Sequence, residues 1–429
     1  MKVLIVGGGG REHAIAVSMK KSKRVDALYC VPGNAGIARI AECEPSIKVM
    51  DFDKVIAYAR EKEVDLVFVA PDDPLVGGLV DALEAAGFRV FGPRKDAAIL
   101  EGSKAFSKDL MKKYGIPTAA YETFDDPEKA LSYLETAKFP IVLKADGLAL
   151  GKGVLICNTL EEAKAGVREI MQDKHFGSAG DRMVIEEFIT GPEVSVLSFV
   201  DGKTIKIMTS AQDHKRAQDG DQGLNTGGMG TFSPTPFYTE EVDAFCRKHI
   251  YQATVDAMAA EGREFKGVIF FGLMLTKDGP RVLEFNARFG DPETQVVLCR
   301  MKNDIMEVID ACIDGTLDQV ELDFEDNAAV CVVLASQGYP VSYEKGFEIT
   351  GLEHFEGKED TFCFHAGSRL DDRGRILTDG GRVLGVTAKG ATLQEARKKA
   401  YSASEWVSFE NKYMRHDIGR AIEEFQGNA

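Results

Sequence analysis

Short apolar runs alternate with amphipathic stretches over the first hundred residues. The apolar runs have strand length and lie at 2–6, 27–31, 66–70 and 89–92. Helical periodicity begins at Arg11 and recurs around 52–61 and 75–86. Strands that alternate with helices form parallel sheets, and ligands bind such sheets beyond the carboxyl ends of the strands. The pattern predicts a doubly wound parallel sheet.

A second alternation of helices and strands follows. A helix is predicted over 97–114 and a strand over 140–144. Another strand starts at Met183 and ends in acidic residues, which are either solvated strand ends or acceptors for adenine and ribose. Polar residues fill 210–216, and a glycine-rich loop follows before a helix over 239–261. Long loops of this kind inside a domain are usually functional.

A hairpin with two chemically different faces comes next. Its strands, 267–276 and the run from Arg281, are joined by the turn sequence Lys-Asp-Gly-Pro. Side chains alternate across a strand, so one face is apolar and the other polar. The residues expected to face the core are Leu283, Phe285 and Ala287, and those expected to face outward are Glu284, Asn286 and Arg288.

The polar face of this hairpin suits a cation and a phosphate. The carboxylate of Glu284 and the amide oxygen of Asn286 can both ligate a hard cation such as Mg²⁺. Arg288 suits the phosphate that the metal would carry. The alternative is a half-exposed strand with a solvated face. An asparagine inside a strand, and the turn-rich run 289–295, favour the functional interpretation.

From Ala328 onward the chain is rich in strands. Strands are predicted over 328–335, 361–366 and 382–388, and a helix over 392–407 that carries Trp406. Candidate catalytic groups are few, and His365 is expected to be structural. These patterns predict a separate α+β domain. The predicted fold class is therefore a multidomain chain that combines α/β and α+β units.

Composition narrows the class of protein further. A chain of 429 residues is expected to form two to four domains. A net charge of −16 argues against nucleic-acid binding, and no apolar run approaches membrane-spanning length. The eight cysteines include no Cys-x-x-Cys pair, which disfavours zinc sites and disulfides and fits a reducing cytoplasm.

Glycine-rich loops mark candidate anion sites. Four glycines at 7–10 lie between the first strand and helix, where backbone N–H groups can bind a phosphate. The dinucleotide fingerprint is incomplete, because its third glycine position holds Glu12 or His13. A sugar-phosphate ligand and a structural turn remain as interpretations. The loops 33–36 and 70–74 are expected at the same sheet edge.

A loop at 145–153 joins two strands and carries several glycines and Lys152. It differs from the phosphate-binding loop of nucleotide hydrolases, because Lys152 is followed by Gly153 and a strand. Backbone N–H groups and an ammonium in such a loop can cover phosphates. A flap over a nucleotide is favoured, with a flexible structural hairpin as the alternative.

Seven motifs occur along the chain in a recognisable order. They are Gly9-Gly10-Arg11-Glu12-His13-Ala14, Pro32-Gly33-Asn34-Ala35-Gly36, Glu101-Gly102-Ser103-Lys104, Leu143-Lys144-Ala145-Asp146-Gly147-Leu148, Gln212-Asp213-His214-Lys215-Arg216, Asn225-Thr226-Gly227-Gly228-Met229-Gly230, and Glu284-Phe285-Asn286 continuing to Gln295. Each is weak alone, but together they are specific. The whole chain resembles the glycinamide ribonucleotide synthetase (phosphoribosylamine–glycine ligase) family of the ATP-grasp superfamily.

The resemblance implies a domain plan. An N-terminal substrate-binding domain would span 1–102, and an ATP-grasp domain would span 103–318 with a mobile lid at about 120–190. A C-terminal α+β domain would span 325–429. ATP would lie between the lid and the central part of the ATP-grasp domain.

The resemblance also implies roles for individual residues. The implied nucleotide-binding residues are Lys104, Lys144, Gly151, Glu186, Glu187, Ile189 and Glu193. The implied substrate-binding residues are Gly10, Arg11, Asn34, Asp72 and Asp291. The implied catalytic residues are Lys152, Asp213 and Arg288. Glu284 and Asn286 match the ligands of Mg²⁺ or Mn²⁺.

Two positions depart from the family's pattern. Asp72 stands where the family has a glutamate, so its side chain is one methylene shorter. Its contact with a substrate therefore differs. Leu150 stands where a small alanine is usual in the lid loop, which changes lid packing more than chemistry.

The implied reaction joins glycine to 5-phosphoribosylamine at the expense of ATP. Glycyl phosphate forms first, and the amine then displaces phosphate to give glycinamide ribonucleotide. The expected partners are these small molecules, without nucleic acid or membrane, in a cytoplasmic monomer or weak homodimer. The alternatives are another ATP-grasp ligase, such as a carboxylase of purine biosynthesis, and a non-catalytic nucleotide-binding regulator.

Overall fold

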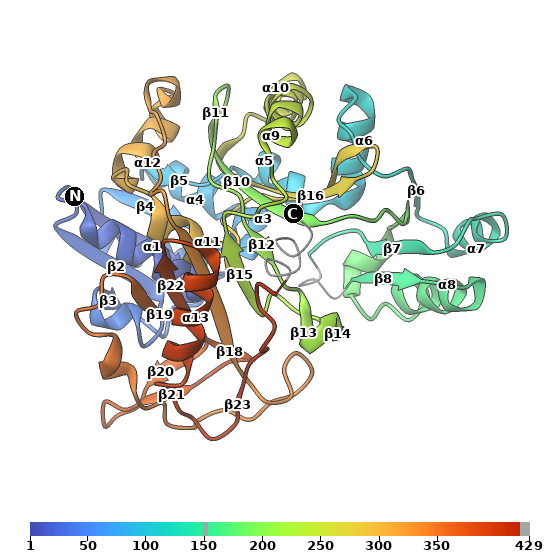
Figure 1. The fold of residues 1–429 in the computed structure, drawn as a ribbon. Coiled ribbons are helices and arrows are strands. Elements are labelled where there is room, and N and C mark those ends of the chain that lie inside the picture. The colour runs from blue at the N-terminus through green and yellow to red at the C-terminus, as the bar shows by residue number, and fades with distance from the viewer. Residues whose placement is uncertain (149–152, 421–429) are drawn as a thin grey trace.

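The N-terminal part of the chain is a parallel sheet covered by helices. The computed structural model describes residues 1–148 and 153–420. The strands β1 (Lys2–Gly7), β2 (Ala27–Pro32), β3 (Glu42–Cys43), β4 (Leu66–Val69) and β5 (Val90–Phe91) pair in parallel in the order β3-β2-β1-β4-β5. Helix α1 (Gly10–Lys21) follows β1, and α2 (Phe52–Glu61) precedes β4. The doubly wound sheet is as predicted (Figure 1).

Two predicted helices are each divided in the structure. The stretch predicted as 75–86 forms α3 (Asp72–Gly77) and α4 (Leu79–Ala85), separated at Gly78 with φ +95°. The stretch predicted as 97–114 forms α5 (Lys95–Gly102) and α6 (Lys104–Tyr114). Ser103 ends the first and caps the second, because its hydroxyl accepts the Phe106 N–H. The apolar periodicity runs through both breaks, although Gly77-Gly78 and Gly102-Ser103 have low helix propensity.

A small sheet projects from the body of the molecule. Its strands are β6 (Tyr121–Phe124), β7 (Ile141–Ala145), β8 (Val154–Cys157) and β9 (Met183–Glu187), in the order β6-β9-β7-β8. Helices α7 (Pro127–Leu134) and α8 (Leu160–Val167) pack on it, and Figure 1 shows the unit reaching away from the other sheets. This unit coincides with the predicted lid, whose mobility stays a prediction.

The central sheet carries the hairpin identified in the sequence. Its strands β10 (Glu193–Asp201), β11 (Ile205–Ile207), β16 (Lys266–Thr276) and β17 (Gly279–Asn286) are in the order β11-β10-β16-β17. Helices α9 (Glu240–Cys246) and α10 (Gln252–Ala260) are joined by a π-helical turn, and α11 (Glu293–Val297) and α12 (Ile305–Asp314) follow.

A bulge in this hairpin corrects one predicted orientation. The pairing of β16 with β17 shifts register between Gly272 and Leu273, which face Glu284 and Val282. Leu283 lies at the shift and is only half-buried, so the prediction that it faces the core is wrong. Val282 is fully buried in its place, while Phe285 and Ala287 are core residues as predicted.

The C-terminal sheet recruits strands from earlier in the chain. It contains β18 (Ala328–Ser336), β19 (Thr361–His365), β22 (Arg382–Gly390) and β23 (Lys412–Tyr413). It also contains β12 (Gln212–Asp213) and β15 (Gly230–Ser233), and β15 pairs directly with β18. The small pairs β13 (Arg216–Gln218) with β14 (Gln222–Asn225) and β20 (Ser368–Leu370) with β21 (Ile376–Thr378) lie beside it. The predicted separate domain is therefore joined to the central one by a shared sheet.

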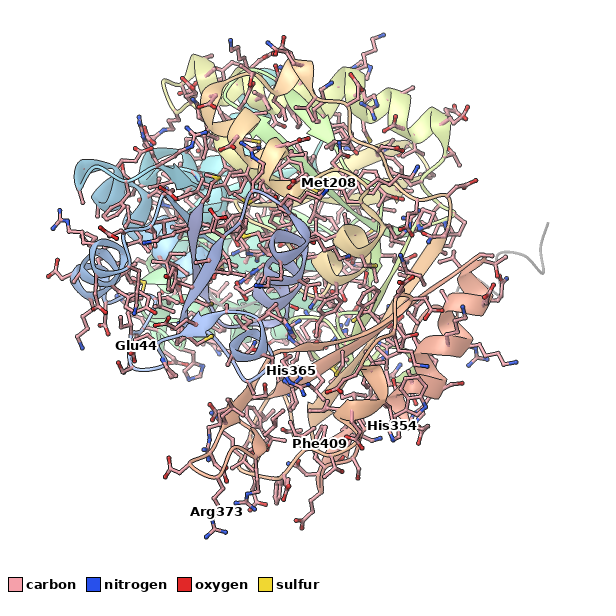
Figure 2. The ribbon with its side chains drawn as sticks, turned by 90° about the vertical axis from the view of Figure 1, so that its left-hand side faces the viewer. Glu44, Met208, His354, His365, Arg373 and Phe409 are labelled. Carbon is pink, nitrogen blue, oxygen red and sulfur yellow. The ribbon has the colours of Figure 1, made fainter. Side chains whose placement is uncertain are left out.

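Helix α13 (Leu393–Ser404) covers this sheet and packs on β18 and β22. It ends before Trp406, so the predicted extension to 407 is wrong. The indole of Trp406 packs instead against Phe355, with ring centroids 5.1 Å apart. Figure 2 shows the N-terminal and C-terminal sheets meeting near His365.

Candidate active site

The first turn of α1 lies against the end of the hairpin. The Arg11 N–H donates to Asp291 Oδ2 at 3.3 Å, and its guanidinium donates to the Phe289 carbonyl at 3.1 Å. A Cβ on Gly10 would lie 2.6 Å from Gln295 Nε2, so a larger residue there would displace the Gln295 side chain. The predicted substrate residues Gly10, Arg11 and Asp291 are therefore brought together.

Asn34 holds two loops of the N-terminal sheet in place. Its Nδ2 donates to the carbonyls of Gly8 and His365, at 3.0 and 2.8 Å. Its Oδ1 accepts the N–H groups of Gly36 and Ile37. With these bonds formed, the side chain fixes the shape of the glycine loop, and a direct substrate contact by Asn34 stays a prediction.

Asp72 begins α3 at the same edge of the sheet. Its carboxylate accepts the Asp73 N–H and makes no other hydrogen bond among the described residues. It acts electrostatically on Arg11 and on Glu101, whose pKa values it raises. A free carboxylate facing a buried arginine is able to accept hydroxyl groups of a sugar.

Glu101 and Arg288 form a buried ion pair on the next wall of the site. Arg288 Nη2 lies 3.0 Å from Glu101 Oε1, and Glu101 Oε2 accepts the Ala287 N–H at 2.7 Å. Burial raises the pKa of Glu101 to about 7, although Arg288 opposes the shift. Glu101 thus orients the arginine that the sequence assigned to catalysis.

Glu284 and Asn286 project from the same face of β17, as predicted. Lys215 Nζ lies 3.3 Å from Glu284 Oε1, and Arg288 Nη2 donates to Asn286 Oδ1 at 3.3 Å. Lys215 lowers the pKa of Glu284 to about 2 despite burial, so this carboxylate stays ionised at neutral pH. An ionised oxygen beside an amide oxygen suits a hard cation.

The geometry fits a metal held jointly by protein and phosphate. Within the described ranges, no group of three or more His, Cys, Asp or Glu side chains could hold a metal. Mg²⁺ is usually bound by one or two carboxylates together with water and substrate phosphates, so a closed protein cage is not required. Glu284 and Asn286 fit that mode.

A buried lysine pair marks the other end of the site. Lys144 Nζ and Lys108 Nζ lie 3.0 and 3.2 Å from Glu186 Oε2. The second oxygen, Glu186 Oε1, is buried and has no hydrogen-bond partner among the described residues. A buried acceptor without a donor is costly unless a ligand completes it. Lys108 was missed because nothing in an amphipathic helix signals that a lysine points inward.

The remaining predicted nucleotide residues lie along the same path. Glu193 Oε2 is 3.6 Å from Lys215 Nζ, so the residue predicted to bind ribose and the predicted metal ligand Glu284 share this lysine. Glu187 is exposed and Ile189 half-buried, just after the end of β9. Lys104 donates to the Gly147 carbonyl at 3.0 Å, at the entrance to the lid loop. Gly151 and Lys152, with Leu150, lie outside the described residues.

Asp213 lies in a cluster of acids around Lys215. Burial and the nearby Glu293 raise the pKa of Asp213 well above its ordinary value. Burial likewise raises the pKa of Glu293, whose carboxylate bonds the Ser195 hydroxyl at 3.2 Å. Two interacting carboxyl groups beside one ammonium can hold a proton in the site.

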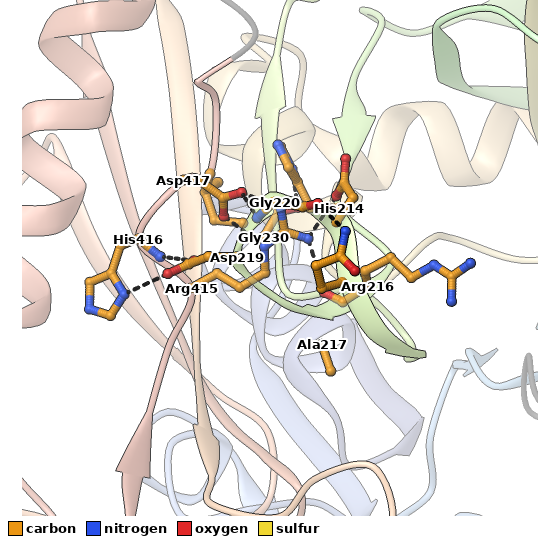
Figure 3. A network of polar contacts seen from close by, with 12 residues as sticks. His214, Arg216, Ala217, Asp219, Gly220, Gly230, Arg415, His416 and Asp417 are labelled. Carbon is orange, nitrogen blue, oxygen red and sulfur yellow. Dashed lines mark hydrogen bonds and ion pairs between the residues drawn. The ribbon is translucent and has the colours of Figure 1, made fainter.

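The loop from His214 to Gly230 is held in place by hydrogen bonds with residues 415–419 (Figure 3). Arg415, only 1% exposed, donates to the Arg216 carbonyl at 3.0 Å and pairs with Asp417 at 2.8 Å. Asp417 accepts the Gly220 N–H at 2.8 Å, and the Gly419 N–H donates to His214. No sequence pattern predicts these contacts, which join segments about two hundred residues apart.

The sheet of β6 to β9 contacts the central hairpin where Lys144 Nζ donates to the Leu283 carbonyl, and Glu284 and Asn286 lie on one face of β17. This arrangement is that of an ATP-grasp protein. Sequence comparisons make the assignment narrower. Family models described as phosphoribosylglycinamide synthetase match the N domain at residues 1–101, the ATP-grasp (A) domain at 102–294 and the C domain at 329–421. The chain belongs to the phosphoribosylglycinamide synthetase family.

Curated relatives match over their whole length. A phosphoribosylamine–glycine ligase of Caldanaerobacter subterraneus is 47% identical over 418 residues, 97% of this chain and 99% of the relative. One of Salmonella typhimurium is 48% identical over 433 residues, 99% of this chain and all of the relative.

Solved structures agree in fold. A phosphoribosylamine–glycine ligase from Thermotoga maritima superposes with TM-score 0.84 at 36% identity, covering 98% of this chain and 100% of that one. The biotin carboxylase domain of 2-oxoglutarate carboxylase from Hydrogenobacter thermophilus reaches TM-score 0.73 at 16% identity, covering 96% and 91%. The second match shows the fold alone.

Proposed function

We propose that the protein ligates glycine to 5-phosphoribosylamine, with conversion of ATP to ADP and phosphate, in purine biosynthesis. The proposal depends on one observation above all. Along β17 and the residues that follow it, Glu284 lies between Leu283, whose carbonyl accepts Lys144 Nζ at 3.3 Å, and Phe289, whose carbonyl accepts the Arg11 guanidinium at 3.1 Å. ATP, which donates the phosphate, and glycine, which accepts it, could therefore meet at the Glu284 carboxylate. The full-length match to phosphoribosylamine–glycine ligases supports the assignment.

The chemistry needs positioning and charge neutralisation more than a protein nucleophile. Glycine's carboxylate attacks the γ-phosphorus of ATP, which releases ADP and leaves glycyl phosphate. The amine of phosphoribosylamine then attacks the acyl carbon, and phosphate leaves. Arg288, oriented by Glu101 at 3.0 Å, stabilises the negative charge on the transferred group. The Asp213–Glu293 pair is placed to take the proton that the amine loses.

The nucleotide is assigned to the lid side of the cleft. The unpartnered Glu186 Oε1 is suited to accept an adenine N–H, and Glu193 the ribose hydroxyls. Glu284 and Asn286 would hold Mg²⁺ or Mn²⁺, which neutralises the phosphates when bound. Lys104, Lys144 and Lys152 would contact phosphates or base. When no metal is bound, Lys215 would neutralise the charge of Glu284, from which it lies 3.3 Å.

The sugar phosphate is assigned to the N-terminal sheet. The N–H group of Gly10 opens α1, where a 5-phosphate is favoured by the helix dipole, whereas the Gly9 N–H donates to Glu12 Oε2 at 2.7 Å. Arg11, Asp72 and Asp291 would complete this end. We expect a cytoplasmic monomer or weak homodimer; none of the described helices is long and apolar enough to cross a membrane.

A direct assay separates this function from its alternatives. Sustained ADP release should require glycine together with phosphoribosylamine, and hydroxylamine should replace that amine by trapping glycyl phosphate as glycyl hydroxamate. A carboxylase would instead release ADP with bicarbonate, and a regulator would bind nucleotide without turnover. Either of those outcomes would contradict the proposal.

A further inference from the structure

A second cavity lies where the N-terminal and C-terminal sheets meet, near His365 in Figure 2. Its volume is about 370 Å³, within the range of small-molecule sites. Its walls are α1, the 3₁₀ turn η1 (Ile37–Arg39), the 3₁₀ turn η8 (Leu352–Phe355) and β19. None of its lining residues belongs to the catalytic, nucleotide or metal set assigned above.

The floor of this cavity is the free edge of a sheet. Strand β19 is the last strand in the order β12-β15-β18-β22-β19. His365 turns its backbone to the free side, where its N–H donates to His13 Nδ1 at 2.7 Å. Bonding alternates along an antiparallel pair, so Cys363 presents its N–H and C=O on the same side. No described residue bonds these two groups.

His13 supplies a further donor. Its Nδ1 accepts the His365 N–H, so the hydrogen of the neutral ring is on Nε2. Burial and the neighbouring His365 lower the pKa of His13 well below its ordinary value, which keeps the ring neutral. No residue in the described ranges accepts from Nε2. Burying an unused donor carries a cost that a ligand acceptor would remove.

The walls are apolar and the rim is charged. Val17, Ile40, Leu352, Phe355 and Phe362 provide the apolar surface. The charged residues of the lining are Arg39, Lys358 and Glu356, and Arg39 pairs with Glu356 at 3.0 Å across an exposed rim. Arg39 and Lys358 outnumber the single carboxylate of Glu356, so the charged lining at the rim of the cavity is net positive.

We propose that this cavity binds a nucleoside monophosphate. The heterocycle would bond the Cys363 N–H and C=O between the apolar walls, and the phosphate would lie at Arg39 and Lys358. A planar base offers adjacent donor and acceptor atoms that match a free strand edge. An added peptide strand is disfavoured, because α1, η1 and η8 wall the edge on its other sides.

A ligand in this cavity would act through Asn34 on the glycine loop 7–10, which is proposed to bind the sugar phosphate. The amide of Asn34 bridges the His365 carbonyl, on the cavity floor, and the Gly8 carbonyl, in the glycine loop. A ligand that shifts β19 therefore shifts the loop that opens α1. The expected kinetic effect is on the KM for phosphoribosylamine rather than on that for ATP.

The single tryptophan reports on this cavity. Trp406 packs on Phe355, which lines the cavity, and Lys358 Nζ lies 5.8 Å from the indole centroid. We would titrate the full chain with AMP and GMP, following tryptophan emission and calorimetric heat. The nucleotide site would first be saturated with a non-hydrolysable ATP analogue and Mg²⁺. Saturable binding is expected, with adenosine and inorganic phosphate each weaker by about tenfold or more.

Val17 offers a matched pair of variants, because it is half-buried and lines the cavity. Val17→Phe should fill the space and abolish binding, while Val17→Ala should retain it, with equal melting temperatures checked first. Arg39→Ala should weaken AMP about tenfold and leave adenosine unchanged. The comparison of AMP with adenosine in Arg39→Ala tests the proposal even if Val17→Phe does not fold.

Three results would overturn the proposal. These are no saturable binding of AMP or GMP at millimolar concentration, undiminished binding to folded Val17→Phe, and inorganic phosphate binding as tightly as AMP. The last would reduce the cavity to a plain anion site.

Discussion

Lys215 lies among four carboxyl groups of the candidate active site. Its ammonium lies 3.3 Å from Glu284 and 3.6 Å from Glu193, and Asp213 and Glu293 also act on it. These carboxylates, Glu284 above all, raise the pKa of Lys215 against the effect of burial. One lysine thus balances the acids that a metal and nucleotide phosphates would otherwise engage.

Glu284→Gln should abolish turnover while leaving the fold intact. The change removes one ligand charge at the phosphates, and we expect a loss of activity of at least about a hundredfold. The measurement is ADP release over a range of Mg²⁺, with the melting temperature as a check on folding. Glu241→Gln, on an exposed side chain outside every assigned site, is the control. Normal turnover of the folded Glu284 variant at ordinary Mg²⁺ would remove it from the metal site.

Asp72→Ala and Lys144→Ala should separate the two substrate sites. Asp72 faces Arg11 at the N-terminal sheet, whereas Lys144 pairs with Glu186 at the lid. Each loss of a charged hydrogen-bond partner is expected to raise one KM by about tenfold or more. Steady-state kinetics should show the KM for phosphoribosylamine raised in the first variant and that for ATP in the second. An Asp72 variant impaired for ATP alone would disprove the division.

The raised pKa of Glu101 predicts a pH dependence of stability. Its pKa in the folded protein is about 7, above the ordinary value of 4.5, so the native state binds the proton more tightly. The stability contribution is therefore full below about pH 4.5 and is lost as the pH rises through 7. The effect is at most roughly 3 kcal/mol.

Glu101→Gln should flatten this part of the profile, since glutamine still accepts the Ala287 N–H but does not titrate. Denaturant unfolding of both proteins between pH 5 and 8 measures the difference. Parallel profiles would show that Glu101 does not titrate in this range.

At the scale of elements, the segment after β23 holds the β13–β14 hairpin against the body. Arg415 donates to the Arg216 carbonyl at the start of β13, and Asp417 accepts the Gly220 N–H in the hairpin turn. Lys215 immediately precedes this hairpin. Movement of the hairpin therefore changes the distance from Lys215 to Glu284.

Asp417→Asn should impair catalysis more than stability. The change weakens the ion pair with Arg415, and we expect kcat to fall about tenfold while the melting temperature drops by a few degrees. Hydrogen exchange at 216–225 should become faster. Glu410→Gln, on an exposed residue just before β23, serves as control. Unchanged hydrogen exchange would show that the segment after β23 does not restrain the β13–β14 hairpin.

At the scale of the whole molecule, the domains are joined by shared sheets and shared cores. The C-terminal core contains Met229 and Phe232, which precede the predicted domain start at 325 by almost a hundred residues. The N-terminal core continues into the central one through Phe68 and Phe289, whose rings stack at 6.2 Å. The predicted boundaries thus remain useful as descriptions of segments, while the folding units overlap.

A fragment of residues 325–429 should not fold cooperatively alone. It lacks β15, so the edge of β18 that β15 covers would be exposed, and Met229 and Phe232 would be missing from its core. Thermal unfolding by circular dichroism should show a broad, weak transition. A fragment that also includes 208–236 through a short linker is the control. A sharp transition in the short fragment would contradict the shared-sheet interpretation.

The sequence by itself determined the local elements and the chemistry of the cleft. Apolar periodicity located β1, β2, α2 and β18 closely, because each buries one stretch with a clear period. Motif order gave the family, and strand alternation put Glu284 and Asn286 on one face, as the structure has them. These inferences depend on residues close in sequence.

Only the tertiary structure decided which distant residues meet. The bulge at Leu283, the inward turn of Lys108 onto Glu186, and the clasp by Arg415 all depend on contacts between separated segments. The same holds for β12 and β15, which pair with a sheet formed mostly a hundred residues later. Pattern and propensity carry no information about such pairings, because their free energy comes from burial and hydrogen bonds that exist only once the chain has folded.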